Sequence, residues 1–293
     1  MRITNSIIQR SALANLQLNM RRVLSAQESV TTGKKIRAAS DDPIGASQVM
    51  QSDGSLRAIE QYKRNVASAT ARVNAEEATL DQLTQLLERA KELGISQAVG
   101  TASSATRLTA KAEVDQLIAS AVQLGNRQHE GEYLFGGIQS TTAPFQGGTP
   151  PFSATPPSGS RQTEISQALY LSANHNGTEV FLDTNVLQSL YDLSTALGND
   201  DITAIQTSLG SLDGAHDSVQ NLIGDVGARS SQLEVTNGNL VAFDTQLRTF
   251  KSAVEDTEME KAVTELVLRQ NTYQAAMLAT SRVMGLNLAD YLR

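Results

Sequence analysis

The chain has 293 residues, contains no cysteine and no tryptophan, and is only 4% aromatic, with a formal net charge of −7 at pH 7. Without cysteine it can form no disulfide, no thiolate metal site and no cysteine nucleophile. Its apolar residues are mostly Ala, Leu, Val and Ile. These residues favour long helices with narrow apolar seams over a compact core filled by bulky side chains.

The first forty residues are basic although the whole chain is acidic. They contain seven Lys or Arg and one acid, Glu28. No aromatic residue precedes Tyr62, so this segment lacks side chains that stack on bases or anchor at a membrane surface. We therefore expect a protein partner for it, with no nucleic acid and no membrane. The start of the chain has no apolar signal core, and no apolar run approaches the roughly 18 residues of a membrane span, so we expect neither a cleaved signal nor a span.

A first long helix is predicted from Pro43 to about residue 98. Asp41-Asp42-Pro43 is typical of a helix start, because Asp accepts free backbone amides and Pro suits the first turn. At the helical rise this element spans about 85 Å. Glu76 interrupts its seam, and we expect a wet or interface position there. The seam residues follow a spacing of seven, most with a second residue three positions later: Ile59, Val66, Val73, Leu80 and Leu87, with Tyr62, Ala69, Leu83 and Ala90.

Two further helices complete the predicted bundle. A shorter one covers about residues 104 to 130, and a second long one of about 80 Å ends near residue 255. Antiparallel packing of the three helices would bury all of their stripes. The stripes are Val114, Leu117, Ala121 and Leu124 in the short helix, and Ile205, Leu212, Val219, Val226, Leu233, Leu240, Leu247 and Val254 in the long one.

The middle of the chain differs from the rest in composition. Five of the six prolines lie between residues 144 and 157, where they exclude helix. Beyond them, Ile165 to Leu171 and Thr178 to Leu182 flank Asn176-Gly177, which predicts a β-hairpin. The fold class is therefore mainly α: an elongated antiparallel coiled-coil helical bundle with a small β-rich tip domain. The expected domains are a rod (41–137 and 186–255), a tip (138–185) and a terminal assembly domain (1–40 and 256–293).

Each chain end carries its own apolar stripe outside the seams of the long helices. These two stripes, paired only with each other, offer little burial for the number of residues that must be ordered. We therefore expect both ends to be mobile in a lone molecule and to pair as helices on assembly. The residues predicted as the assembly interface are Leu13, Leu16, Met20, Val23 and Val30 at the N-terminus and Val263, Leu266, Tyr273, Met277 and Met284 at the C-terminus. The C-terminal stripe also includes Thr280.

Catalytic and ligand-binding patterns are weak throughout. His129, His175 and His216 have no partner at metal-ligand spacing, so no metal site is expected. The carboxylate pairs Asp41-Asp42, Glu76-Glu77 and Asp200-Asp201 would diverge on a helix and suit caps or solvated faces. Gly131 to Gly137 is glycine-rich but lacks the Lys-Ser/Thr of a phosphate-binding loop. We therefore expect a non-enzymatic protein with no cofactor and no small-molecule substrate.

Two motifs lie close together near the start of the chain: Thr32-Gly33-Lys34-Lys35-Ile36 and Ser40-Asp41-Asp42-Pro43. They are similar to the Ser-Gly-Lys-Arg-Ile and Ser-Asp-Asp-Pro signature of the flagellin superfamily, with Thr32 in place of Ser. Within that superfamily the chain resembles the hook-associated protein 3 type found at the hook-filament junction. Gly131-Glu132-Tyr133-Leu134-Phe135-Gly136-Gly137 before Pro144-Phe145 resembles the junction type more than filament flagellin. The stretches from Gln270 to Ala276 and from Leu288 to Leu292 resemble the same group, with Asn271 where a second Gln is common.

The resemblance implies a ring of identical subunits between the hook-side junction protein and the filament flagellin. It also implies export as an unfolded chain through the flagellar type III apparatus, an extracellular location on the flagellum without a cleaved signal peptide, and a cytoplasmic export chaperone on residues about 256–293. Two alternatives stay open. A filament flagellin would have the same helices and ends, and a coiled-coil adaptor or tether would share the heptads without needing free terminal segments.

Overall fold

The computed structural model describes the backbone of residues 2–172 and 174–291, and the side chains of residues 7, 9–172 and 174–282. It divides into two compact units. One, here called the terminal unit, combines Met1–Arg57 with Phe243–Arg293. The other, the central unit, is Ala58–Ala242. Each unit is described by itself below.

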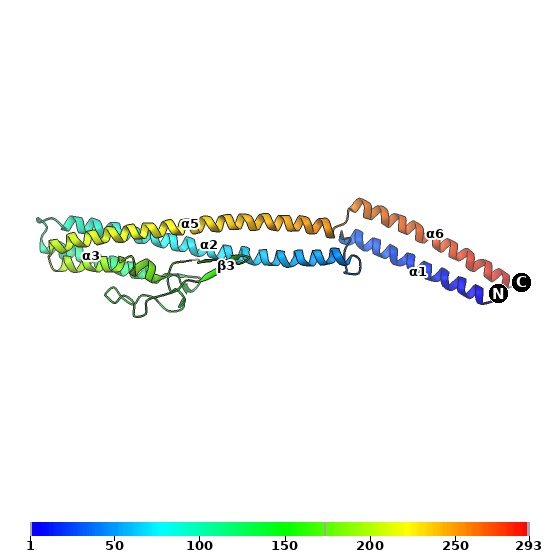
Figure 1. The fold of residues 1–293 in the computed structure, drawn as a ribbon, viewed down its shortest axis with the longest axis horizontal. Coiled ribbons are helices and arrows are strands. Elements are labelled where there is room, and N and C mark those ends of the chain that lie inside the picture. The colour runs from blue at the N-terminus through cyan, green and yellow to red at the C-terminus, as the bar shows by residue number, and fades with distance from the viewer. Residues whose placement is uncertain (1, 173, 292–293) are drawn as a thin grey trace. The chain divides into compact units, whose positions relative to one another are not determined.

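Long helices dominate the chain, with only two small antiparallel sheets in the part that is described (Figure 1). The prediction of a mainly α fold is confirmed. The first long helix, α2, runs over Pro43–Gln97, and the second, α5, over Ile202–Glu255, close to the predicted bounds. Asp42 Oδ1 accepts the backbone amides of Ile44 and Gly45 at 3.1 and 3.0 Å, so the Asp-Pro start works as the sequence predicts.

In the central unit α2 and α5 lie side by side, and the predicted seams face inward. Ion pairing of Lys91 with Asp213 joins the two helices across the seam. The seven-residue rows of both helices are buried throughout this unit: Ile59, Val66, Val73, Leu80 and Leu87 on α2, and Ile205, Leu212, Val219, Val226, Leu233 and Leu240 on α5. The heptads therefore describe a real packed interface.

Two shorter helices, α3 (Ser104–Gly125) and α4 (Val186–Gly198), pack against each other in the same unit. The Ser103 side chain caps α3 by accepting the amide of Thr106 at 3.2 Å. The expected extension of α3 to residue 130 is wrong. The chain turns instead into a hairpin of β1 (Gln128–His129) and β2 (Glu132–Tyr133), because Glu130 and Gly131 both adopt a positive φ that a helix cannot hold.

The one hairpin predicted from the sequence, around Asn176-Gly177, is misplaced. Strand β3 (Gln162–Ser166) pairs with β4 (Leu169–Ser172), and the turn contains Ala168 with a φ of 58°. Thr178–Leu182 is one turn of π-helix, not a strand. Asn176 and Glu179 each accept the other's backbone amide at 3.0 Å, so the Asn-Gly pair starts a helical turn instead of closing a hairpin.

Three phenylalanines form the centre of the non-helical part of the central unit. Phe135 and Phe145 each form a T-shaped ring contact with Phe181, at ring-centroid distances of 5.4 and 5.1 Å. Gly125 and Gly177 leave room for these rings, since an added Cβ would lie 2.6 and 3.0 Å from Phe145. The proline-rich stretch 144–157 is irregular as predicted and places Phe145 in this cluster.

Two buried charged side chains tie separate segments to α2. Glu76 is fully buried, so the expected wet or interface position is wrong. Its Oε1 lies 2.6 Å from His175 Nδ1 and accepts the His175 amide at 3.1 Å. Arg107 donates to the carbonyls of Gln97 and Val99 at 3.2 and 3.0 Å, which satisfies the C-terminal end of α2.

Candidate assembly interface

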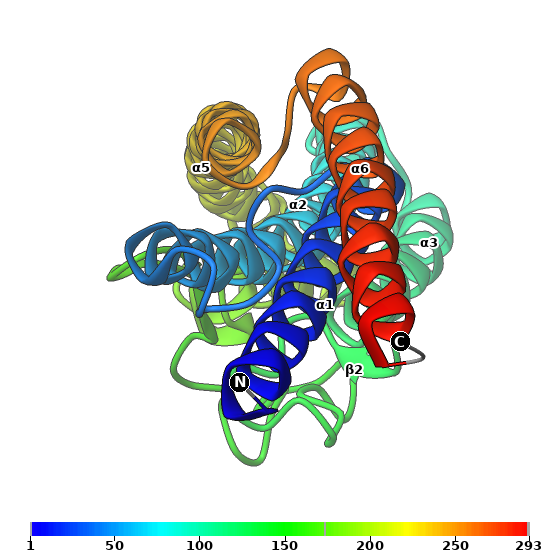
Figure 2. The ribbon, with the colours of Figure 1, turned by 90° about the vertical axis from the view of Figure 1, so that its right-hand side faces the viewer.

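The terminal unit contains helices α1 (Arg2–Thr32) and α6 (Met259–Tyr291), which lie side by side and run antiparallel (Figures 1 and 2). One face of each helix is less exposed than the rest and faces the partner helix. Its residues follow strict steps of three and four: Ala12, Leu16, Asn19, Val23, Ala26 and Val30 on α1, and Ala262, Leu266, Arg269, Tyr273, Ala276 and Thr280 on α6. This inner seam is a two-helix coiled-coil contact.

The structure splits the residues predicted for the assembly interface between two faces. Leu16, Val23 and Val30 lie in the inner seam of α1, and Leu266 and Tyr273 lie in that of α6. The others stay exposed on a second face: Leu13 (50%), Met20 (41%), Val263 (45%) and Met277 (43%). Met284 lies outside the residues whose side chains are described.

Sequence reasoning missed the small and polar members of the seam. Ala12, Ala26, Ala262 and Ala276 repeat at the seam spacing, but a search for large apolar residues passes over them. Small side chains let the two helices approach closely, and the larger apolar residues are then free for the outer face. The signal that could have found the seam is the pair of alanines spaced by fourteen positions on each helix.

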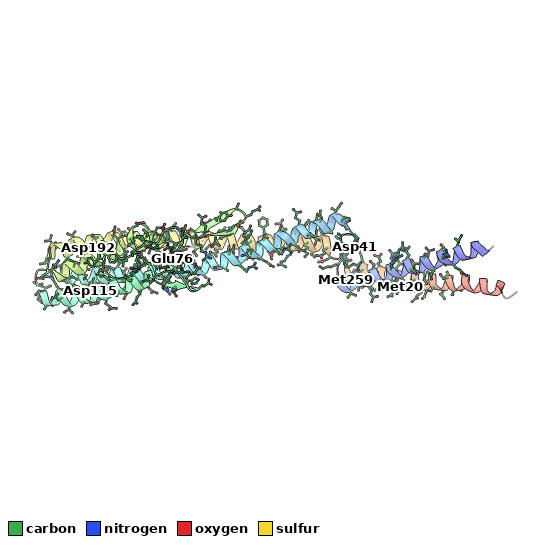
Figure 3. The ribbon with its side chains drawn as sticks, turned by 90° about the horizontal axis from the view of Figure 1, so that it is seen from below. Met20, Asp41, Glu76, Asp115, Asp192 and Met259 are labelled. Carbon is green, nitrogen blue, oxygen red and sulfur yellow. The ribbon has the colours of Figure 1, made fainter. Side chains whose placement is uncertain are left out.

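The outer faces of the terminal unit are unusually apolar. Met20 on α1 and Met259 on α6 are labelled in Figure 3 as two examples, both more than two-fifths exposed. Among the side chains that the structure describes, the only buried apolar ones in this unit are Ile36, Leu56 and Ala262. Exposed large apolar residues are far more numerous: Ile7, Leu13, Leu18, Met20, Leu24, Ile44, Met50, Phe243, Phe250, Met259, Val263, Val267, Leu268, Met277 and Leu278. A helix with two apolar faces is suited to pack on more than one neighbour.

A short joint connects α1 to α2 and holds the end of α5. Gly33 ends α1 with a φ of 71°, and its carbonyl accepts the amide of Thr257 at 2.8 Å. Lys35 donates its amide to the carbonyl of Glu255 at 2.8 Å, and Lys34 Nζ lies 2.5 Å from the Glu255 carboxylate. The Gly-Lys-Lys part of the motif therefore builds a structural joint between chain segments more than 200 positions apart.

The rest of that motif closes the same joint. Asp41 Oδ2 accepts the amides of Arg37 and Ala38 at 3.1 and 3.0 Å. These hydrogen bonds, first that from Ala38 and then that from Arg37, hold the pKa of the Asp41 carboxyl below its usual value. Ile36 is buried against Gly45, where any Cβ would collide with it. Ser40 is exposed, and Pro43 opens α2.

The second motif, Gly131 to Gly137, is part of the packed core of the central unit. Leu134 and Phe135 are fully buried, and their carbonyls accept the Asn174 side chain at 2.5 Å and the Gly177 amide at 2.8 Å. Tyr133 is half-buried and donates its amide to Ser140. Gly136 and Gly137 approach backbone carbonyls so closely that a Cβ at either position would collide with them.

The paired carboxylates serve caps and ion pairs. Asp201 caps α5 by accepting the amides of Thr203 and Ala204 at 2.9 and 3.0 Å, while Asp200 pairs with Arg107. Within the described part of the chain, no three His, Asp or Glu side chains are placed to hold a metal ion. None of the helices described has a stretch both long and apolar enough to cross a lipid bilayer.

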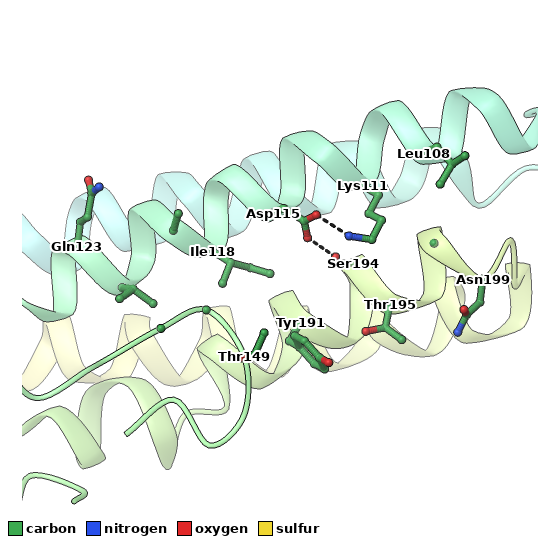
Figure 4. A pocket seen from close by; sticks show the side chains of 15 residues that line it. Leu108, Lys111, Asp115, Ile118, Gln123, Thr149, Tyr191, Ser194, Thr195 and Asn199 are labelled. Atoms are coloured by element: carbon green, nitrogen blue, oxygen red, sulfur yellow. Dashed lines mark hydrogen bonds and ion pairs between the residues drawn. The ribbon is translucent and has the colours of Figure 1, made fainter. Parts of the chain in front are cut away.

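An open groove of about 870 Å³ lies between α3 and α4 in the central unit (Figure 4). Asp115 crosses it and accepts hydrogen bonds from Lys111 at 2.5 Å and from Ser194 of α4. Burial raises the pKa of the Asp115 carboxyl, but the Lys111 and Ser194 hydrogen bonds outweigh it and leave the pKa below its usual value. The arrangement fastens α3 to α4.

Comparison with known proteins agrees with this architecture. The bacterial flagellin N-terminal helical region matches residues 3–140 and the bacterial flagellin C-terminal helical region matches residues 201–292, which together are more than three quarters of the chain. Flagellar hook-associated protein 3 of Escherichia coli is 24% identical over 306 residues, covering 93% of this chain and 96% of that protein. The flagellar filament 31.3 kDa core protein of Treponema maltophilum is 23% identical over 275 residues, covering 91% of each.

A solved structure shares the fold. A flagellar hook-associated protein from Vibrio parahaemolyticus superposes with a TM-score of 0.67 at 19% identity, covering 74% of this chain and 100% of that one. Three observations support the same family: the paired terminal helices, the motif at the joint, and the two helical regions that the family models match. The chain therefore belongs to the bacterial flagellin family of structural flagellar proteins.

Proposed function

We propose that this protein is a structural subunit of the hook-filament junction of the bacterial flagellum, and that identical copies form a ring through α1 and α6. The observation that carries the proposal is the second apolar face of the terminal unit, which the two helices leave exposed after forming their own seam. Covering this face requires neighbouring subunits. The relative in Escherichia coli, matched over nearly its whole length, is named as a hook-associated protein.

The test is restoration of flagella in a strain that lacks this chain. We expect hooks without attached filaments in the deletion strain and attached filaments when the full chain is supplied. Met20→Asp and Val263→Asp place charge on the outer apolar face, and each should leave filaments detached. Leu169→Asp, at a residue of similar exposure (40%) on the strand hairpin of the central unit, is the matched control and should restore attachment. Normal filaments in the deletion strain would refute the proposal.

Filament flagellin is the second candidate. It is favoured by the spirochaete relatives, which are named as filament core proteins and match over nine tenths of the chain. A filament subunit should be by far the most abundant protein in sheared filaments. A junction subunit should be scarce and confined by immunogold labelling to the proximal end.

A coiled-coil adaptor or tether is the third candidate, from another functional class. Removal of α1 and α6 separates it from the first two. A tether so trimmed should still bind its partner, whereas a junction subunit should remain a helical rod in solution and fail to join either hook or filament. The three-part division into assembly, rod and tip domains stays a prediction, and this truncation also tests its outer boundaries.

The export partners belong to the same proposal. The neighbours in the assembled structure are a hook-side junction protein and the filament flagellin, and the chain reaches the cell exterior through the flagellar export apparatus without a cleaved signal. A cytoplasmic chaperone binds residues 256–293 before export, because the apolar faces of α6 would otherwise bind other chains. Truncation after Glu255 should abolish chaperone binding in a pull-down, while Phe135→Ala, which alters only the central unit, should not.

A further inference from the structure

A basic groove of about 330 Å³ lies between α1 and α6, near the joint. It lies within the terminal unit and is separate from the apolar outer face described above. Four cationic side chains and one carboxylate line it, giving it a net positive charge: Arg22 from α1, Lys35 from the joint, and Lys261, Arg269 and Glu265 from α6.

The cations of this groove are poorly neutralised. Neither Arg22 nor Lys35 has a carboxylate partner among the described residues, and Lys35 Nζ only donates to the carbonyl of Ala253 at 3.1 Å. Lys261 and Arg269 pair with Glu258 and Glu265 of the same segment at 2.8 and 2.9 Å. Such exposed pairs between residues three or four positions apart contribute little energy, so the groove can still attract a further anion.

An acidic stripe of complementary charge occurs on α2 in the central unit. Glu77, Asp81 and Glu88 are exposed and lie on one helical face, since they are spaced by four and seven positions. In the described structure Glu77 and Asp81 have no ion pair, and Glu88 only approaches His216 at 3.8 Å. The stripe extends over about 16 Å, which is longer than the roughly 10 Å of groove between Arg22 and Ser29. Glu77 and Asp81, about 6 Å apart along the helix axis, therefore fit within this length, and Glu88 lies beyond its end.

The two units also differ in overall charge. The terminal unit contains 14 Lys or Arg and 11 Asp or Glu, whereas the central unit contains 10 and 20. Opposite net charge steers the terminal unit of one molecule toward the central unit of another. The groove lining contains no aromatic side chain, which disfavours single-stranded nucleic acid as its occupant.

We propose that the basic groove between α1 and α6 binds Glu77 and Asp81 of the acidic stripe of a second copy of this chain, and so sets the register between neighbouring subunits. This inference rests on the proposed self-assembly and names the contact that orients it. The apolar outer face drives association without direction, whereas charge pairing at fixed positions selects one register.

A charge swap tests the pairing. Arg22→Glu with Lys261→Glu, and separately Glu77→Lys with Asp81→Lys, should each reduce the number of filaments retained per cell by about tenfold, because like charges then face each other. The four substitutions together should restore retention. Failure of the combined variant to exceed either double variant, while its central unit keeps wild-type circular dichroism, would overturn the proposed pairing.

Cross-linking in assembled flagella tests the same contact independently of attachment. The chain has no native cysteine, so a disulfide between introduced cysteines is unambiguous. Ser25→Cys in the groove combined with Asn74→Cys beside the stripe should give a covalent dimer on a non-reducing gel. Ser25→Cys combined with Gln116→Cys, an exposed position on α3, is the matched control and should give none.

The outcomes separate the inference from the proposed function. Flagella that assemble from the Ser25→Cys, Asn74→Cys variant without any dimer would overturn the inference and leave the junction role intact. Cross-linking of Ser25→Cys to a different flagellar protein would overturn the second copy as occupant. Filaments in the strain lacking the chain would instead refute the junction role itself.

Discussion

Helices of the central and terminal units share the same seven-residue spacing of seam residues, but the two units bury these residues to very different extents. In the central unit, α3, α4 and the hairpins cover α2 and α5, so the seam residues Val73, Leu80 and Val219 are completely buried. In the terminal unit, α1 and α6 have only each other, and even the seam residues Leu16 and Val23 remain partly exposed. Two helices can bury one narrow stripe each, so a second apolar face on either one stays uncovered. A seven-residue pattern therefore identifies a helix that packs against others. It does not indicate whether all of the covering segments belong to the same molecule.

The two units should differ most in the rate at which their backbone amides exchange hydrogen with solvent. In dilute monomer we expect backbone amides of α1 and α6 to exchange at least about a thousandfold faster than those of α2 near Val73, because the terminal pair lacks a core. In assembled flagella the same amides should become slow. Strong protection of residues 5–35 in dilute monomer would contradict the proposed dependence on neighbours.

Substitution of one phenylalanine in each unit should show the difference in burial as a difference in unfolding free energy. Phe135→Ala should destabilise the central unit by about 3–5 kcal/mol, since its ring is fully buried against Phe181. Phe250→Ala removes a ring that is 47% exposed in the terminal unit, and should change stability by less than about 0.5 kcal/mol. Urea unfolding followed by circular dichroism gives both values, and equal losses would mean that the two units are packed alike.

The buried Glu76 should show how strongly the strand region depends on α2. Glu76→Ala leaves the amide and ring nitrogen of His175 without their shared partner, and should cost about 3 kcal/mol. Glu234→Ala, an exposed glutamate on α5 in the same unit, is the control and should be nearly neutral. Similar urea midpoints for both variants would argue against the Glu76–His175 contact.

Alanine substitution of two glycines with positive φ should reduce stability by different but smaller amounts. Gly137→Ala in the central unit adds a collision with the Ser158 carbonyl to the backbone strain, and should cost about 2 kcal/mol or more. Gly33→Ala in the joint has open space around it and should cost no more than about 1 kcal/mol, from the left-handed backbone alone. Thermal unfolding of the two variants tests the order, and a larger loss at Gly33 would contradict it.

The smallest expected effect is the acid sensitivity of the joint. Because the folded pKa of Asp41 lies below its ordinary value of 3.8, its contribution to stability is present above that value and is lost as pH falls below it. Exchange of the Arg37 and Ala38 amides in assembled flagella should therefore speed up below about pH 4. Asp41→Asn should remove most of this pH dependence, and an unchanged profile in that variant would show that another group controls the joint.

Much of the central unit could be predicted because helical seams are local patterns. The bounds of α2 and α5 follow from the Asp-Pro cap, the glycine after the helix and the seven-residue rows, all read from short stretches. The prediction of a hairpin around Asn176 was wrong because an Asn-Gly pair suits both a hairpin turn and a helix start. The Glu179 carboxylate, which accepts the Asn176 amide, favours the helix start.

Local patterns along the chain were enough to predict that it is mainly helical, that its ends differ from its middle, and that its motifs resemble those of the flagellins. Three features could be seen only in the folded chain: Glu76 is buried, Leu16 and Met20 lie on different faces of α1, and Arg22 and Lys261 line one groove. Periodicity defines which residues share a face of one helix. Which face meets a partner depends on segments far away in the chain, whose approach is set by packing and charge and not by any local pattern.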